Sequence, residues 1–133
     1  MKRSLTAVLG TAAAVLATAA FAHHSFAVYD MQHEIEFKGV VDTVQFRNPH
    51  MAMTLTHEKP DGTKEIIHFV EGAPANMLVR MGLTPEMIKP GQTITAIGAP
   101  RKDDPNAYFL KSIILPDGKR FDGFPAARPK EEK

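Results

Sequence analysis

The stretch EIEFKGVVDTVQF, residues 34–46, decides the fold class of this chain. Its β-branched and aromatic side chains predict a strand from Glu34 to Phe46. Before Gly39 the apolar side chains stand at odd-numbered positions, Ile35 and Phe37. After it they stand mainly at even-numbered positions, Val40, Val44 and Phe46, so a regular strand would place the two sets on opposite faces. We therefore expect a bulge or a sharp bend at Gly39 that returns both sets to one core.

Two further strands follow in quick succession. Asn48-Pro49 ends the first strand, and from Met51 the chain alternates apolar and small or polar residues as far as Thr56. That two-residue period predicts a half-buried strand whose core-facing side chains are Met51, Met53 and Leu55. Pro60 and Gly62 then supply turn geometry, and a third strand is expected from Lys64 to about Val70.

The pattern changes to a helical one after the third strand. Pro74 suits the first turn of a helix, and Gly82 can supply its left-handed end, so a helix is expected over Pro74 to Met81. Its expected apolar stripe comprises Met77, Leu78 and Met81. A very short second helical start follows at Thr84-Pro85-Glu86, and strands are then expected over Gln92–Gly98 and Tyr108–Leu115, with a short pairing at Lys119–Phe121.

This order of elements indicates a mainly β fold. Three strands, one helix and two strands, with a bent first strand, match a small five-stranded OB-like barrel with its helix between strands 3 and 4. An open β-sandwich, or an α+β sheet with one covering helix, is the alternative. Spacing along the chain does not separate these architectures.

The beginning of the chain is typical of a secretory signal peptide. Lys2 and Arg3 precede an apolar run, and Ala20 and Ala22 supply the small residues of a cleavage site. We expect cleavage after Ala22, which makes residues 1–22 the signal peptide and the mature protein periplasmic or secreted. Residues 23–124 are then a single β-rich domain. Residues 125–133, rich in proline, alanine and charge, are expected to be disordered.

Composition excludes several classes of function. The formal charge of +1 becomes −1 once Lys2 and Arg3 leave with the signal, which gives no electrostatic reason to expect nucleic acid as a partner. No mature segment is apolar and long enough to span a membrane. The chain has no cysteine, so disulfides, thiolate metal sites and thiol catalysis are all excluded.

The mature N-terminus is the strongest candidate for a metal site. Cleavage after Ala22 would free the α-amino group of His23, and that amine and its own imidazole can close a chelate on a divalent metal. His24 is a candidate third imidazole. His50 follows Pro49 at the start of a strand, so a stiff backbone is expected to point it out of the core. Such nitrogen donors suit Cu(II), with Zn(II) as the competitor.

We expect the remaining histidines, the methionines and Glu71 to have structural roles. His33, His57 and His68 are scattered in the sequence, and the methionines lie mostly on expected core faces, where packing is favoured over ligation. Glu71 could cap the helix start or approach the metal as a carboxylate ligand, and we favour capping. No Ser-His-Asp order, carboxylate pair or phosphate-binding glycine loop is found in the sequence.

A series of short motifs runs through the mature chain in a fixed order: His23-His24-Ser25-Phe26-Ala27, Asp30, Gly39-Val40-Val41, Asn48-Pro49-His50, Glu71-Gly72-Ala73-Pro74, Leu78 with Gly82, Lys89-Pro90-Gly91 and Leu115-Pro116-Asp117-Gly118. In these motifs the chain resembles a family of small exported bacterial proteins known only as a domain of unknown function. The resemblance implies no activity. His68 and Leu83 stand where an aromatic residue such as tryptophan is expected, which argues against a shared aromatic surface.

Three functions are compatible with these features. The first is a non-enzymatic periplasmic binding module with a copper-type site, acting as a metal carrier, buffer or sensor component. The second is a metal-free OB-like module that binds a small ligand or a periplasmic protein partner through its barrel face. The third is a histidine-brace copper oxidoreductase, which we rank last because only Tyr29 and Tyr108, and no tryptophan, could line a substrate surface.

Overall fold

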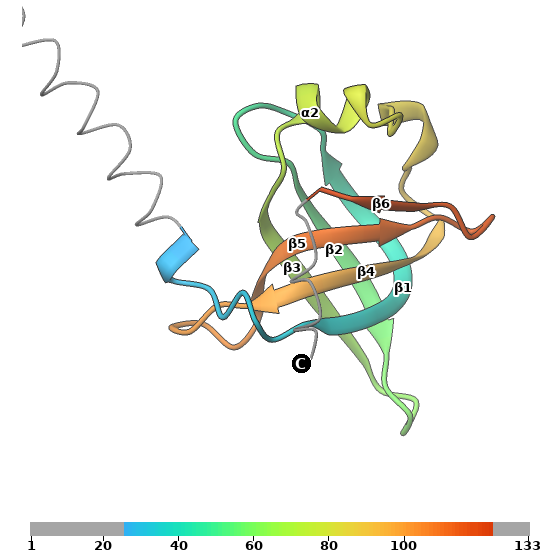
Figure 1. The fold of residues 1–133 in the computed structure, drawn as a ribbon. Coiled ribbons are helices and arrows are strands. Elements are labelled where there is room, and N and C mark those ends of the chain that lie inside the picture. Colours follow the sequence, from blue (N-terminus) through green and yellow to red (C-terminus); the bar gives the residue numbers. More distant parts are fainter. Residues whose placement is uncertain (1–25, 124–133) are drawn as a thin grey trace, which may run out of the picture.

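Six strands form one continuous sheet in residues 26–123, the part of the chain that the computed structural model describes (Figure 1). Their bounds are β1 Ile35–Gln45, β2 Ala52–Glu58, β3 Lys64–Gly72, β4 Thr93–Pro100, β5 Ala107–Ile114 and β6 Arg120–Asp122. β6 is the short pairing expected near Lys119–Phe121, shifted by one residue. The strand bounds otherwise differ from the sequence predictions by at most two residues.

The sheet closes into a barrel. Its strand order is β3-β2-β1-β4-β5-β6, and β3 also pairs with β5, which joins the two sides of the sheet. The β3–β5 pair is parallel and all other pairs are antiparallel. A closed five-stranded mixed barrel with one short helix between β3 and β4 confirms the OB-like prediction, and the open sandwich and the α+β sheet are excluded.

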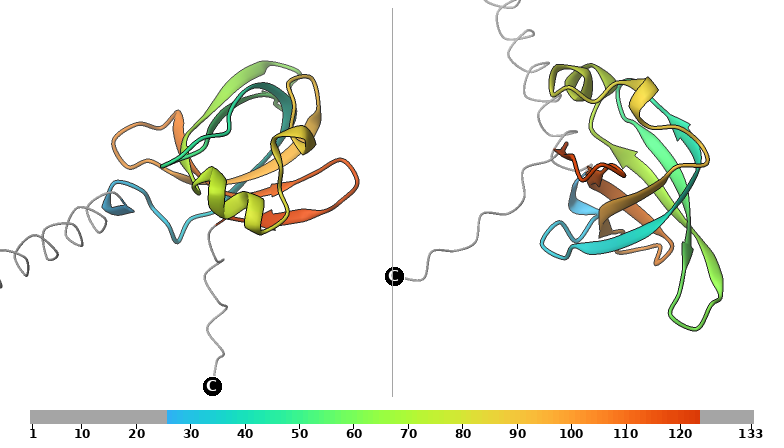
Figure 2. Two further views of the ribbon diagram at one scale, coloured as in Figure 1. Left: turned by 90° about the horizontal axis from the view of Figure 1, so that it is seen from above. Right: turned by 90° about the vertical axis from the view of Figure 1, so that its right-hand side faces the viewer.

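Helix α2, Ala75–Arg80, covers one end of the barrel (Figure 2, left). It is shorter than the expected Pro74–Met81 because Pro74 is its extended N-cap, with ψ 143°, and Gly82 follows with φ +95°. The expected apolar stripe is wrong in part: Leu78 is buried, but Met77 and Met81 are each 39% exposed. A helix of six residues turns one narrow face inward, and Ala75 and Leu78 occupy it.

A short 3₁₀ helix, η1, spans Pro85–Met87 and follows α2. It begins where the sequence predicted a very short second helical start, with Thr84 as its extended N-cap. Met87 packs partly against the core.

The change of parity in β1 lies at Asp42, and the predicted bulge at Gly39 is wrong. Val41 pairs with Leu55 of β2, but the next pair joins Thr43 to Thr54, which leaves Asp42 as the extra residue. Val40 therefore stays on the outside of the barrel, 41% exposed. The sequence suggested Gly39 because Val40 is apolar, yet this valine is not part of the core.

Gly39 is required for a different reason. It pairs with His57 in β2 and with Ile94 in β4, so both neighbouring strands are hydrogen-bonded to β1 around this position. β1 is visibly bent along its course around the barrel (Figure 1). A Cβ at this position would lie 2.3 Å from the carbonyl oxygen of Thr56. Only glycine permits this close approach of two backbones.

The barrel interior follows the predicted alternation of β2. Met51, Met53 and Leu55 are each at most 2% exposed, which confirms that they face the core. Phe37 and Phe69 pack against them in the same cluster. Met51 and Met53 act here as packing side chains, as the sequence predicted.

Residues 26–34, which we call the strap, cross the outside of the barrel at β4 and β5 (Figure 1). The Phe26 and Tyr29 rings meet the Phe109 ring edge-on, with centroids 5.6 and 5.5 Å apart. At the other end of the strap, Lys111 is only 3% exposed, and its ammonium donates to the carbonyl of Met31 and pairs with Glu34. The strap is thus anchored at both ends.

Candidate functional site

Two of the motifs that the sequence analysis singled out lie against each other. The loop that contains Asn48-Pro49-His50 runs beside Glu71-Gly72-Ala73-Pro74, at the end of β3. The amide of Met51 donates to the carbonyl of Ala73 at 3.1 Å, and the amide of Ala75 donates to the carbonyl of Arg47 at 3.1 Å. These backbone bonds clamp the His50 loop from both sides.

Asn48 caps the start of α2. Its side-chain oxygen accepts a hydrogen bond from the amide of Asn76 at 3.1 Å. The N-cap residue Pro74 makes no side-chain cap bond. The preferred interpretation of Glu71 as the helix cap is therefore wrong, because an asparagine from the neighbouring loop fills that role.

His50 points out of the core, as predicted, and both of its ring nitrogens face oxygen atoms. Nδ1 lies 3.1 Å from the carbonyl oxygen of Gly72, and Nε2 lies 3.4 Å from Oε1 of Glu71. A carbonyl oxygen can only accept, so Nδ1 carries the hydrogen. The side chain is 45% exposed, so the ring is partly open to solvent.

Glu71 joins His50 to the strap. Its side chain is 17% exposed, and its second oxygen, Oε2, accepts a hydrogen bond from the Tyr29 hydroxyl at 3.0 Å. Burial of the phenol, reinforced by the hydrogen bond and the charge of Glu71, raises the pKa of Tyr29 well above its ordinary value. Tyr29 therefore remains a hydrogen-bond donor throughout the physiological pH range.

Sequence reasoning missed the role of Tyr29. The sequence suggests Tyr29 as a residue that could line a substrate surface, but it is 3% exposed. Tyr108 is half-buried and packs on Phe37 and Phe69. Tyr29 and Glu71 are 42 residues apart in sequence. No local pattern links them, because strap packing brings them together.

His50 and Glu71 line an open pocket of about 510 Å³. The pocket lies between the His50 loop and the end of β3, and its walls are Arg47, Asn48, Pro49, His50, Val70 and Glu71. The imidazole of His50 and the carboxylate of Glu71 both belong to its lining, with Nε2 and Oε1 3.4 Å apart. These two atom types can hold a proton or a small cation between them.

The other described histidines do not join this site. His57 directs Nδ1 at the carbonyl of Lys38, 2.8 Å away, and its ring meets Phe37 edge-on. His33 and His68 are exposed elsewhere. Within residues 26–123, no group of three or more His, Cys, Asp or Glu side chains could hold a metal ion. The predicted ligands His23 and His24 lie outside the described residues, as do the predicted signal peptide and the predicted disordered tail.

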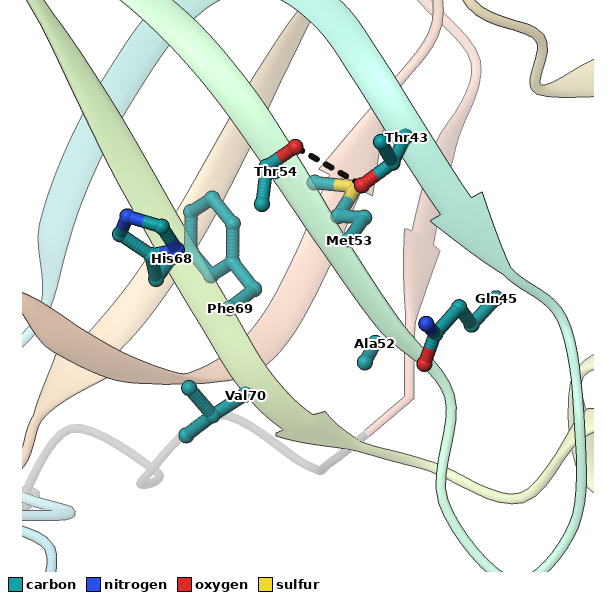
Figure 3. A pocket seen from close by; sticks show the side chains of 8 residues that line it. All are labelled: Thr43, Gln45, Ala52, Met53, Thr54, His68, Phe69 and Val70. Atoms are coloured by element: carbon teal, nitrogen blue, oxygen red, sulfur yellow. Dashed lines mark hydrogen bonds between the residues drawn. The ribbon is translucent and has the colours of Figure 1, made fainter.

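A second hollow lies on the outer surface of β1, β2 and β3 (Figure 3). It is small, about 130 Å³, and Thr43 and Thr54 share a hydroxyl–hydroxyl hydrogen bond of 2.8 Å beside it. His68 and Val70 point from β3 along the same face (Figure 3). OB-type barrels commonly bind their ligands on the face of strands 2 and 3.

Fold and site together define a small OB-like barrel in which a half-exposed His50 lies beside the largely buried Glu71 at the end of β3. The chain belongs to a family of unknown function, DUF6152, whose model matches residues 12–108. This match confirms the resemblance to a family without an assigned function. No curated protein and no solved structure matches the chain. In the part of the chain that the structure describes, no helix has the length and apolarity needed to cross a membrane.

Proposed function

We propose that the mature protein is an exported periplasmic module that binds one divalent metal ion and serves as a carrier, buffer or sensor component. The ligands are the α-amine and imidazole of His23 together with the imidazole of His50, and His24 is a further candidate. Cu(II) is the expected ion and Zn(II) its competitor. The observation that carries the proposal is the orientation of the His50 ring.

The His50 ring is held as metal-binding imidazoles usually are. Such a histidine donates one ring N–H to a carbonyl or carboxylate, and this bond fixes the tautomer and leaves the other nitrogen for the metal. In His50 the Nδ1 hydrogen bond to Gly72 has this role, and the ring lines the open pocket. His57 has a similar Nδ1 bond, to the carbonyl of Lys38, but it does not line this pocket, whereas His50 lines it beside the carboxylate of Glu71.

The strap supports the participation of His23. Phe26 packs on Phe109, and Phe109 is paired with Glu71 in the β3–β5 ladder. His23 precedes Phe26 by three residues, a length that spans at most about 10 Å of extended chain. The proposal requires these three residues to bring the α-amine of His23 to the pocket that His50 lines.

The choice of Cu(II) follows from the donor atoms. An amine and two imidazoles are nitrogen ligands, and the chain has no cysteine to favour a thiolate-bound metal. Cu(II) lies at the top of the usual divalent affinity order and accepts planar nitrogen sets. Zn(II) accepts the same donors in a tetrahedral arrangement.

A metal-free binding module is the second candidate. The outer face of β1–β3 exposes Val40, Ile66 and Val70 by 41%, 56% and 43%, around polar threonine side chains. Apolar side chains exposed together on one sheet face favour contact with a ligand or protein partner. This function would leave His50 without a part in binding.

A competition titration with Cu(II), followed by electron paramagnetic resonance, tests the metal proposal. The exported protein should first show, by intact mass, a start at His23. It should bind about one Cu(II), and a variant with one extra residue before His23 should bind far more weakly. His50→Ala should weaken binding, with His57→Ala and His68→Ala as controls that do not.

Binding should also weaken below about pH 6, because protons then compete for imidazole nitrogen. Equal affinity for the native and the extended N-terminus would contradict the chelate at His23. If His50→Ala also left the affinity for Cu(II) unchanged, the metal-free module would be the better account.

A further inference from the structure

The carboxylate of Glu71 faces the same ring nitrogen that the proposed function assigns to the metal. We propose that Glu71 is a ligand in this site and that Tyr29 is the positioning residue that orients it. This inference rests on the proposed function for the presence of a metal. Glu71 adds an oxygen ligand to the nitrogen ligands, so the site suits a divalent ion that accepts both kinds of atom.

The tautomer of His50 provides the first argument. Because Nδ1 donates to Gly72, the neutral ring carries its lone pair on Nε2. That lone pair faces Oε1 of Glu71 across 3.4 Å. A lone pair and a carboxylate oxygen repel each other unless a proton or a cation lies between them. The pair is therefore arranged to share a positive species.

The separation of the two atoms provides the second argument. Two ligand atoms bound at about 2.0–2.2 Å to one tetrahedral ion lie about 3.3–3.6 Å apart. The observed 3.4 Å between Nε2 and Oε1 lies in this range. A square-planar ion brings adjacent ligands to about 3 Å, so it would require Nε2 and Oε1 to move about 0.4 Å closer to each other. The pair thus requires little rearrangement to bind a metal.

Tyr29 fixes which oxygen of Glu71 faces His50. Its hydroxyl donates to Oε2, and Oε1 is left on the side of the ring. The tyrosine is held by the strap, since its ring packs on Phe109 and its neighbour Asp30 donates a backbone hydrogen bond to Pro100 at 2.9 Å. Outer contacts of this kind hold a ligating carboxylate in one orientation and raise metal affinity.

Glu71→Gln is the direct test, because the amide keeps the shape of the side chain and removes its charge. The matched control is Glu65→Gln on the same strand, whose carboxylate pairs with Lys59 at 2.9 Å. Measured by Cu(II) competition, Glu71→Gln should lower affinity by more than about tenfold and Glu65→Gln should not. The copper hyperfine coupling should change only in the Glu71 variant, because it reports the donor atoms.

Tyr29→Phe tests the positioning role. The phenylalanine keeps the ring contact with Phe109, so thermal unfolding of the metal-free protein should show a folded chain. Affinity should fall by roughly tenfold, and the copper spectrum should broaden as Glu71 loses its fixed orientation. An unchanged affinity and spectrum would overturn the role of Tyr29.

The same variants in the chain with one extra N-terminal residue separate this inference from the proposed function. If the extension has no effect but Glu71→Gln still weakens binding, the chelate at His23 fails and the His50–Glu71 pair stands. If the extension weakens binding but Glu71→Gln matches Glu65→Gln in affinity and spectrum, the role of Glu71 is overturned. A mature protein that binds no Cu(II) overturns both.

Discussion

Neighbouring residues of β2 and β3 show how sharply burial alternates in this barrel. Leu55 is fully buried and pairs with Ile67, which is 4% exposed. One position further along, Thr56 pairs with Ile66, which is 56% exposed. Two isoleucines adjacent in sequence therefore lie on opposite sides of the sheet, and only one contributes to the core.

Leu55→Ala should destabilise the protein by roughly 2–5 kcal/mol, because it leaves a cavity in a tightly packed interior. Ile66→Ala is the control and should change the free energy of unfolding by less than about 0.5 kcal/mol, as exposed positions usually do. Urea unfolding of both variants measures the difference. Similar values for the two substitutions would contradict the packing of β2 described above.

The candidate site could be predicted only in part from single residues. The orientation of His50 followed from Pro49 and from the alternation of the next strand, both of which are local. The contact of Tyr29 with Glu71 did not follow, because it joins the strap to the end of β3. Asn48 as the cap of α2 was missed for the same reason: it lies 28 residues before the amide that it caps.

The order and kind of elements were predictable, since turns and periodicity are local properties of the chain. Barrel closure by the β3–β5 pair agrees with the predicted architecture. The place of the β1 bulge was not predictable from apolar parity, because Val40 is apolar and yet exposed. The alternation of apolar residues locates the core-facing positions of a strand only when all its apolar side chains face inward. In β1 the side chain of Val40 faces outward.

Gly39→Ala should test how β1 bends. The added methyl would lie 2.3 Å from the carbonyl oxygen of Thr56, a backbone atom that cannot rotate away. We expect a loss of about 3 kcal/mol or more in the free energy of unfolding. Val40→Ala, at the next and exposed position, should have a small effect. A Gly39→Ala protein as stable as the wild type would show that β1 and β2 can separate at little cost.

The strap packs on the outside of the barrel and contacts the candidate site through Tyr29. It carries Tyr29 toward Glu71 at one point and Glu34 toward the buried Lys111 at another. The Tyr29, Phe109 and Ala99 side chains form a small apolar cluster of their own, separate from the barrel core. Loss of the strap would therefore remove the Tyr29 hydroxyl that bonds to the carboxylate of Glu71.

The Glu34–Lys111 pair allows this link to be tested. Glu34→Gln leaves the ammonium of Lys111, 3% exposed, without its carboxylate, and should cost about 3 kcal/mol in the free energy of unfolding. Lys111→Met removes the buried charge and keeps a side chain of similar length, so it should cost under about 1.5 kcal/mol. Glu65→Gln, which breaks the exposed pair with Lys59, should cost at most about 1 kcal/mol.

Chemical unfolding gives these values, and limited proteolysis reports whether the strap detaches before the barrel unfolds. Glu34→Gln should expose the strap to cleavage at denaturant concentrations that leave the barrel intact, whereas Lys111→Met should not. The reason is that an unpaired buried ammonium can regain its hydration only if the segment covering it moves away. If Lys111→Met proved the more damaging change, the pair would be a net stabilising contact, and the strap would be held by electrostatic attraction more than by its aromatic packing.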